Sequence, residues 1–198
     1  MEWHAPLQTS GHVASKTRVT GIHDKGEDAH AFIRSERLVF DAESGARLAT
    51  LTQTHIVRGG GGFGGPAPEP PVRRTPTGEP SVQVDVPTRP EQALLYRLNG
   101  DTFALHSSPA HARSAGFERP VLHGMCTAGI ALQVLLRTIA SGDPARFKRV
   151  SLRFSGPVVP GDTLQVQAWD DGSFCVRIPA RDLTVIDDAR LELGPGAP

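Results

Sequence analysis

The chain has 198 residues, enough for one or two domains. Lys and Arg number 21 and Asp and Glu also number 21, so no net charge attracts nucleic acid or an anionic membrane surface. The 21 Gly and 17 Pro favour loops and turns over a helical bundle, and two cysteines cannot build a disulfide framework. No apolar run reaches the ~18 residues of a membrane span, and no signal-peptide pattern is present. We therefore expect a cytoplasmic protein with neither a membrane nor a nucleic-acid partner.

Residues 12–58 contain three segments rich in β-formers, at 12–23, 29–40 and 47–58. Between them, "DKGED" and "DAESGA" are turn sequences. This part therefore predicts a three-stranded β-meander. Residues 59–80 are dominated by Gly and Pro and predict a linker, flexible at its glycines and extended at its prolines. We expect domain boundaries near 1–58 and 81–198, on either side of this linker.

The second half begins with a strand, "SVQVDV", followed by a bend that contains Pro. "SSPAHARSAGF" predicts a short helix with Ser108 as N-cap, Pro109 as its first residue and Gly116 as its terminator. A long segment starting at 121 predicts a helix apolar on most sides, and such a helix is covered by other structure.

Three strand segments follow this helix, at 147–159, 162–171 and 173–187. An antiparallel sheet curled around one long helix is the hotdog arrangement, so the predicted class is α+β with a hotdog fold. The N-terminal meander then predicts a partial hotdog.

Candidate chemistry lies between the first strand and the long helix. Asp101 and His106 would point about 140° apart on a regular helix, but in a loop they can converge on one water molecule. The plain alternative is a turn aspartate followed by a surface histidine. His123 and Gly124 stand where the long helix begins, and free N–H groups at a helix start suit an oxyanion. Gly124 lets a carbonyl approach closely, although tight helix packing would also explain a glycine there.

The stretch "YRLNGDTFALHSSPAHARSAGFERPVLHGMCTAGIA" resembles the signature of the MaoC-like family of (R)-specific enoyl-CoA hydratases, also called hydratase 2. "SLRFSGPVVPGDTL" is similar to a later strand and turn of that family, and "RGGGGFGG" is similar to the end of its N-terminal hotdog. The resemblance covers nearly the whole chain. It implies a two-hotdog enzyme of fatty acid metabolism whose N-terminal hotdog is truncated here.

The resemblance also implies roles for individual residues. Asp101 and His106 match the acid/base pair that holds and activates water, and Gly124 matches the amide that binds the thioester oxygen. The implied reaction is hydration of trans-2-enoyl-CoA to (3R)-3-hydroxyacyl-CoA, or the reverse dehydration, by a hydro-lyase without metal or other cofactor. Substrate contacts are expected from four further residues, namely Phe103, His123, Met125 and Arg119, the last toward a CoA phosphate. A homodimer or heterodimer through the hotdog sheets is also implied.

Two departures from the family pattern leave an alternative open. Phe103 stands where the family has Asn, which removes a polar group from the site, whereas Ser108 for Asp is mild because Ser also caps helices. Together with the shortened N-terminal hotdog, Phe103 permits a non-catalytic acyl-CoA-binding protein or a partner subunit of a hetero-oligomer. A hotdog thioesterase is disfavoured, since "MCTAGIALQVLLRTIAS" in the long helix carries no Asp or Glu.

Overall fold

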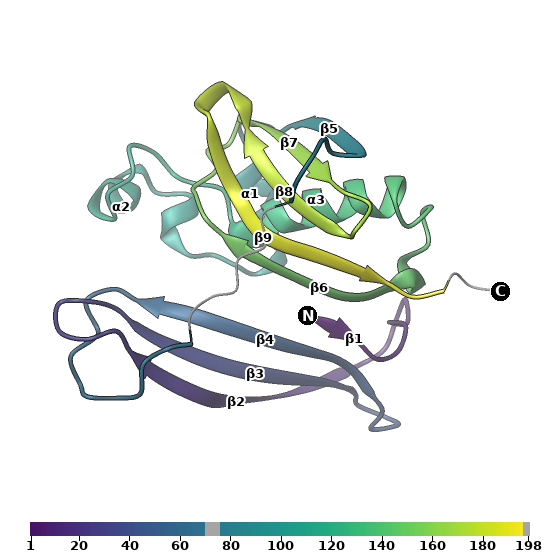
Figure 1. Cartoon of the computed structure of the whole chain (residues 1–198), viewed down its shortest axis with the longest axis horizontal. Coiled ribbons are helices and arrows are strands. Elements are labelled where there is room, and N and C mark those ends of the chain that lie inside the picture. The colour runs from purple at the N-terminus through teal and green to yellow at the C-terminus, as the bar shows by residue number, and fades with distance from the viewer. Residues whose placement is uncertain (70–75, 196–198) are drawn as a thin grey trace. The chain divides into compact units, whose positions relative to one another are not determined.

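The computed structural model describes residues 1–69 and 76–195. The chain divides into two compact units, Met1–Arg73 and Arg74–Pro198, and each contains a set of antiparallel strands (Figure 1). Part of the predicted linker, residues 70–75, lies outside the described residues. The rest of it, at 59–69 and 76–80, contains neither helix nor strand. Within the described ranges, no helix is both long and apolar enough to cross a membrane.

The N-terminal unit is an antiparallel sheet in the order β2-β3-β4-β1. Its strands are β1 (Glu2–Trp3), β2 (Val13–Asp24), β3 (Ala31–Asp41) and β4 (Arg47–Val57). The predicted three-stranded meander is thus present, whereas the two-residue β1 was not predicted because so short a strand has no pattern. Along β2, the side chains of Val13, Val19 and Ile22 are exposed. They remain so because the described part of this unit contains no helix to pack on the sheet.

A buried carboxylate holds the glycine-rich loop that follows β4. Asp24, only 6% exposed, accepts hydrogen bonds from the N–H groups of Gly26 at 2.8 Å, Gly62 at 2.8 Å and Gly64 at 2.7 Å. These bonds, that of Gly62 foremost, lower the pKa of Asp24. A side chain at Gly61 would collide with the carbonyl oxygen of Gly26, so that position requires glycine. The loop thus surrounds a carboxylate that accepts its N–H groups, a set of contacts that the linker prediction did not include.

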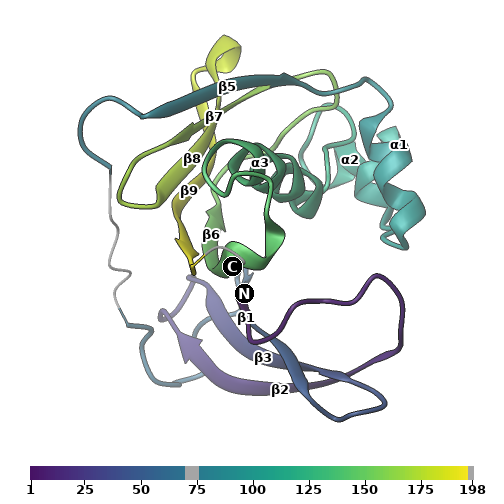
Figure 2. The same ribbon diagram turned by 90° about the vertical axis from the view of Figure 1, so that its right-hand side faces the viewer.

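The C-terminal unit is an antiparallel sheet in the order β6-β9-β8-β7-β5, which curves around helix α3 (Gly124–Thr138; Figure 2). Its strands are β5 (Val82–Pro87), β6 (Phe147–Phe154), β7 (Thr163–Ala168), β8 (Ser173–Ile178) and β9 (Leu183–Leu193). Two shorter helices, α1 (Gln92–Tyr96) and α2 (Pro109–Ser114), precede α3. One long helix against a curled antiparallel sheet is the predicted α+β arrangement.

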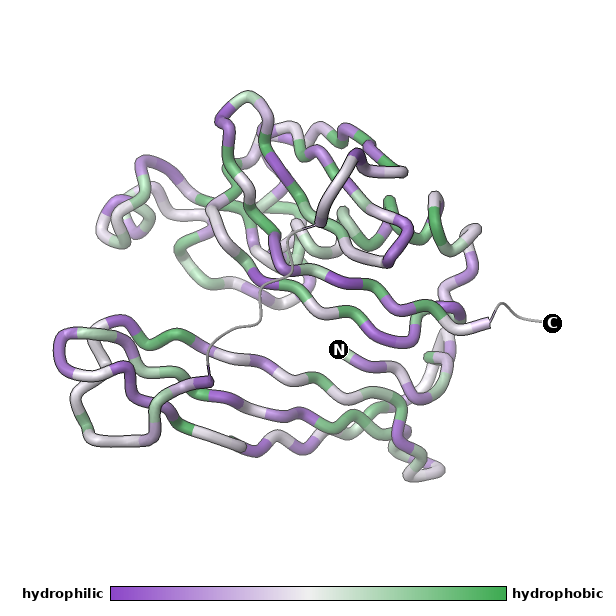
Figure 3. The backbone as a smooth tube through the Cα atoms, viewed as in Figure 1, coloured by the Kyte–Doolittle hydropathy of each residue, from purple (hydrophilic) through white to green (hydrophobic). Residues whose placement is uncertain are grey.

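Alternating side chains build the core of this unit. Along its strands hydrophobic residues alternate with hydrophilic ones, and the inward set of β7, β8 and β9 is almost fully buried (Figure 3). Helix α3 contributes the small side chains of Ala128 and Ala131, which are 1% and 0% exposed and allow close packing. The predicted covering of α3 on most sides is wrong at its start and middle, where Met125 is 53% exposed and Gly129 is also exposed.

The segment 173–187, predicted as one strand, is instead β8 and the first part of β9. Pro179 has no N–H with which to continue the ladder of β8, and it opens a single 3-10 turn. Asp182 then adopts a left-handed conformation with φ of 43°, which reverses the chain into β9. Proline and a left-handed aspartate are turn signals, so this boundary was readable from the residues themselves.

Helix α2 forms as its end signals predicted. The Ser108 hydroxyl oxygen accepts the N–H of His111 at 3.3 Å, and Pro109 occupies the first turn. At the other end, Gly116 has a φ of 86° and the N–H of Phe117 returns to the carbonyl oxygen of Ala112 at 2.9 Å. The loop that carries Asp101 and His106 is therefore followed by a short helix that is capped at both ends.

Candidate active site

Asp101 and His106 both project from one short loop between α1 and α2. Gly100, with a φ of 102°, ends the 3-10 turn after α1 in a left-handed conformation, and Asp101 follows it directly. The Asp101 carboxylate accepts the N–H of Phe103 at 3.3 Å, and a second 3-10 turn, Ala104–His106, then carries His106. Local turn geometry, rather than helix periodicity, thus decides where the two side chains point.

The structure brings this pair together with a third residue. Asp101, His106 and His123 each place one nitrogen or carboxylate oxygen within 4.8 Å of the others. Their exposure is graded, since Asp101 is exposed, His106 is half-buried and His123 is buried. The convergence predicted for Asp101 and His106 is therefore present, and His123 joins it from the start of α3.

A main-chain carbonyl fixes the tautomer of His106. Its Nδ1 lies 2.8 Å from the carbonyl oxygen of Val121, and a carbonyl oxygen can only accept a hydrogen bond. The proton of neutral His106 therefore sits on Nδ1, which leaves the Nε2 lone pair free to accept a proton. Val121 is itself buried, 6% exposed, in the extended segment before α3, so the acceptor is held firmly.

The ring of His123 packs directly behind His106. The two ring centroids are 3.7 Å apart with planes 25° from parallel, and Tyr96 covers His123 at 4.8 Å. His123 Nε2 lies 3.1 Å from the main-chain oxygen of Asp101. Burial, followed by the neighbouring His106 and Arg97, lowers the pKa of His123 against the opposing effect of Asp101. A neutral ring therefore lies inside the protein, 1% exposed, rather than at its surface.

Phe103 packs against His106 at the solvent-exposed end of the stacked rings of His123 and His106. Its ring meets His106 edge-on, with centroids 6.1 Å apart, and meets His111 of α2 at 5.2 Å. Phe103 is 56% exposed, so it borders the site instead of filling a core position. Edge-to-face contacts of this kind favour one orientation of the His106 ring.

The stacking of the two histidines argues against a metal ion shared by them. An ion bound by an imidazole lies in the plane of that ring. With centroids 3.7 Å apart and planes 25° from parallel, the two ring planes meet only about 8 Å from the centroids, whereas a bound ion lies about 3 Å from each. In this orientation the two rings cannot both direct a nitrogen lone pair at one ion.

The start of α3 offers an unused donor. His123 is its N-cap but makes no side-chain capping bond, and the first turn contains no acidic residue to offset the positive helix end. Among the described residues, no hydrogen bond engages the N–H of Gly124. A methyl group at Gly124 would lie 3.2 Å from the ring of Phe154, so the glycine leaves a narrow approach to its amide.

The remaining predicted contact residues lie on the surface nearby in the chain. Met125 is the second residue of α3 and is 53% exposed, and Arg119 is exposed in the loop between α2 and α3.

Three residues near the site, Tyr96, Val121 and Phe154, were not predicted, because each acts through a tertiary contact that has no local signal in the sequence. Burial raises the pKa of Tyr96, with smaller contributions from Cys126 and Asp101, which keeps its phenol protonated behind His123.

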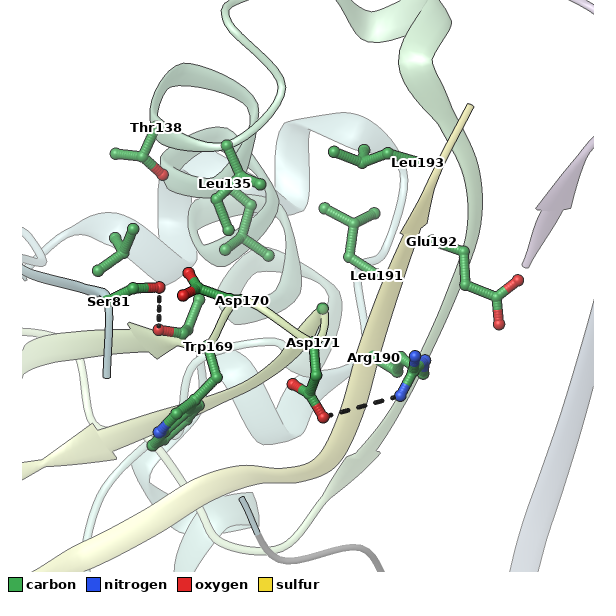
Figure 4. A pocket seen from close by; sticks show the side chains of 14 residues that line it. Ser81, Leu135, Thr138, Trp169, Asp170, Asp171, Arg190, Leu191, Glu192 and Leu193 are labelled. Atoms are coloured by element: carbon green, nitrogen blue, oxygen red, sulfur yellow. Dashed lines mark hydrogen bonds and ion pairs between the residues drawn. The ribbon is translucent and has the colours of Figure 1, made fainter. Parts of the chain in front are cut away.

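A cavity of about 690 Å³ lies at the other end of α3 (Figure 4). It is lined by Leu135 and Thr138 of α3, by the turn at Trp169–Gly172 and by the end of β9. Thr138 follows Gly124 by fourteen residues, about 21 Å along a helix. This cavity is therefore separate from the cluster of Asp101, His106 and His123.

Comparison with known proteins adds independent information. The family model described as "MaoC like domain" matches residues 72–185. The 3-hydroxyacyl-thioester dehydratase Y of Mycobacterium tuberculosis is 42% identical over 84% of this chain and 58% of its own length. The peroxisomal enoyl-CoA hydratase 2 of Arabidopsis thaliana is 34% identical over 94% of this chain and 64% of its own. The chain thus spans less than two thirds of these relatives.

Solved structures agree with the fold. The crystal structure of a MaoC-like dehydratase from Phytophthora capsici superimposes with a TM-score of 0.90 at 33% identity, covering 99% of this chain and 70% of that one. A Mycobacterium tuberculosis protein described as a double hotdog fold gives a TM-score of 0.61 at 17% identity, over 97% of this chain and 72% of that one. The second likeness shows the fold alone, and it confirms the predicted hotdog.

Proposed function

The chain belongs to the MaoC-like domain family, and on that premise we propose that it hydrates trans-2-enoyl-CoA to (3R)-3-hydroxyacyl-CoA, or catalyses the reverse dehydration. One observation carries the proposal: the Asp101 carboxylate lies within 4.8 Å of a ring nitrogen of His106, a residue whose Nε2 has a free lone pair. The Gly124 amide at the start of α3 supplies a second, separate element of the same chemistry.

In the proposed mechanism, His106 Nε2 takes a proton from a water molecule that the Asp101 carboxylate orients. The water oxygen bonds to C3 of the enoyl thioester, and the electron pair of the C2–C3 double bond moves toward the thioester oxygen. The Gly124 N–H and the positive end of α3 stabilise the resulting enolate. C2 then receives one proton from the pair, so one proton is taken and one returned.

The other predicted contacts extend this proposal. Phe103 and Met125, both more than half exposed, would border the acyl group, and Arg119 would meet a CoA phosphate. The pair and the amide need no cofactor for this chemistry. We further propose residues 81–198 as the catalytic hotdog, residues 1–58 as a partial N-terminal hotdog, and a dimer through hotdog sheets. A cytoplasmic location stays a prediction, and the Arabidopsis relative is named as peroxisomal.

The direct test is the loss of enoyl-thioester absorbance when purified protein is added to crotonyl-CoA, with the product analysed for its 3R configuration. Asp101→Asn and His106→Ala are expected to lower kcat by about 10²- to 10⁴-fold, the usual contribution of general acid–base groups. Asp170→Asn and His12→Ala are matched controls, because both residues are exposed and belong to other parts of the chain. Both controls are expected to keep the wild-type rate.

Two results would contradict the proposal. A wild-type rate no higher than that of the Asp101 and His106 variants would show that this pair performs no hydration. Binding of the thioester without turnover would instead favour the non-catalytic acyl-CoA-binding alternative, which the activities named for the relatives do not favour.

A further inference from the structure

His123 is the one member of the cluster that faces no solvent, yet it contacts both residues of the proposed pair. We propose that His123 is a positioning residue, which holds Asp101 through a hydrogen bond to its main chain and holds His106 through ring stacking. This role rests on the proposed function for its catalytic consequence, although its structural part can be tested without activity. It replaces the direct substrate contact expected for this residue from the family resemblance.

The hydrogen bond to Asp101 requires a particular form of His123. The Asp101 carbonyl oxygen only accepts, so Nε2 of His123 carries the proton, and Nδ1 of a neutral ring then has a lone pair. Nδ1 is buried and has no hydrogen-bond partner among the described residues. A buried acceptor without a partner is destabilising, and a phenylalanine would fill this place without it. A histidine is therefore explained by its donor and not by packing alone.

The stack on His106 supplies the second contact. His106 is held at one edge by the Val121 carbonyl oxygen and across one face by the ring of His123 at 3.7 Å. Two constraints of different direction define the plane of His106 and hence the direction of its free Nε2. Because His123 is neutral, it adds no positive charge beside a ring that takes up a proton in the proposed reaction.

The contacts of His123 join the loop after α1 to the start of α3, in addition to the bond between His106 and Val121. Asp101 belongs to the loop after α1, whereas His123 is the N-cap of α3, the helix whose first amide is Gly124. Tyr96, at the end of α1, also packs against the His123 ring, with ring centroids 4.8 Å apart. Through these contacts, His123 fixes the positions of Asp101, His106 and the Gly124 amide relative to one another.

Two substitutions separate the two contacts. His123→Gln keeps an N–H donor at a similar reach and loses the ring, whereas His123→Phe keeps a ring and loses the donor. Each is expected to lower kcat by about 10- to 100-fold on crotonyl-CoA, the effect of small misplacements of reacting groups, with KM changed less than about twofold. A merely structural role would lower the melting temperature and leave kcat unchanged at temperatures where the variant is folded.

Nitrogen–proton NMR correlations of the imidazole rings test the geometry in the wild-type protein alone. In the neutral form of each ring, His123 is expected to carry its proton on Nε2 and His106 on Nδ1. In His123→Gln, the ring signals of His106 are expected to shift and broaden, because its ring loses the stacking partner while the Val121 carbonyl oxygen still accepts from Nδ1. An Nδ1-protonated or charged His123 would overturn the proposal, as would unchanged kcat in both variants. If the wild-type protein does not hydrate crotonyl-CoA, the proposed function fails, and the tautomers still decide whether His123 holds this geometry.

Discussion

Substitution of Gly124 by alanine separates the role of its amide from the stability of helix α3. Cα–Cβ bonds of a helix tilt toward its N-terminus, so a methyl group at the first residue stands beside the free N–H. The added carbon would lie 3.2 Å from two ring carbons of Phe154 and 3.3 Å from a third. Since Phe154 is 46% exposed, its ring can give way by a few tenths of an ångström, and the fold should survive.

The effect on catalysis should be much larger than the effect on folding. Replacing glycine by alanine inside a helix gains about 1 kcal/mol, and the contact with Phe154 offsets much of this, so stability should change by less than about 1 kcal/mol. A thioester oxygen that can no longer reach the Gly124 amide loses one oxyanion donor, worth about 10²-fold in kcat, or about 2.7 kcal/mol. Crotonyl-CoA hydration and thermal unfolding of the same preparation measure the two quantities.

Gly129 provides the matched control within the same helix. It is exposed, and a methyl group there would meet nothing within 4 Å. Gly129→Ala should therefore raise the melting temperature by about 2–4 °C and leave kcat/KM unchanged. If Gly124→Ala kept the same kcat/KM as Gly129→Ala, the Gly124 amide could not be the oxyanion donor.

Three further predictions concern single residues. Phe103→Asn restores a polar side chain beside the pair and should raise kcat by up to about tenfold; an unchanged rate would show that the reaction does not need that group. Asp24→Ala should speed amide hydrogen exchange at Gly62 and Gly64, and in the wild type the same opening should appear only as pH falls below the ordinary aspartate value of 3.8, because hydrogen bonding lowers the pKa of Asp24. Burial lowers the pKa of His123 below its ordinary 6.5, so the unfolded chain binds this proton first and the free energy of unfolding should fall as pH drops below that value. Denaturant titrations should show a weaker fall in His123→Gln.

Local signals predicted much of the C-terminal unit. The cap at Ser108, the proline after it and Gly116 set the ends of α2, because each acts through its own backbone conformation. Turn residues likewise marked the strands of the N-terminal meander. The spacing of Asp101 and His106 allowed their convergence, since five residues of loop are enough to bring two side chains together, but it also allowed a turn aspartate and a surface histidine, and the family resemblance favoured the pair.

The long-range contacts, in contrast, correspond to no pattern in the sequence from which they could be predicted. The Asp24 carboxylate binds amides 38 and 40 residues further along, and nothing in either segment alone indicates that pairing. The acceptor for His106 is the main-chain carbonyl oxygen of Val121. Because every residue carries such a carbonyl, the residue type at 121 could not indicate this contact. The role of His123 depends on both effects, and periodicity showed only that it begins a helix.

Main-chain contacts explain why Phe103, in place of a polar residue, does not disturb the positions of Asp101 and His106. His106 is held by the carbonyl oxygen of Val121, and Asp101 is engaged through its own carbonyl oxygen by His123. The Asp101 carboxylate accepts the main-chain N–H of residue 103, which any residue except proline provides. The side chain at 103 therefore does not contribute to this hydrogen-bonded frame and acts on the solvent side only, where Phe103 supplies an exposed ring in place of a polar group. It follows that Phe103→Asn should change the rate and leave the tautomers of His106 and His123 as they are in the wild type.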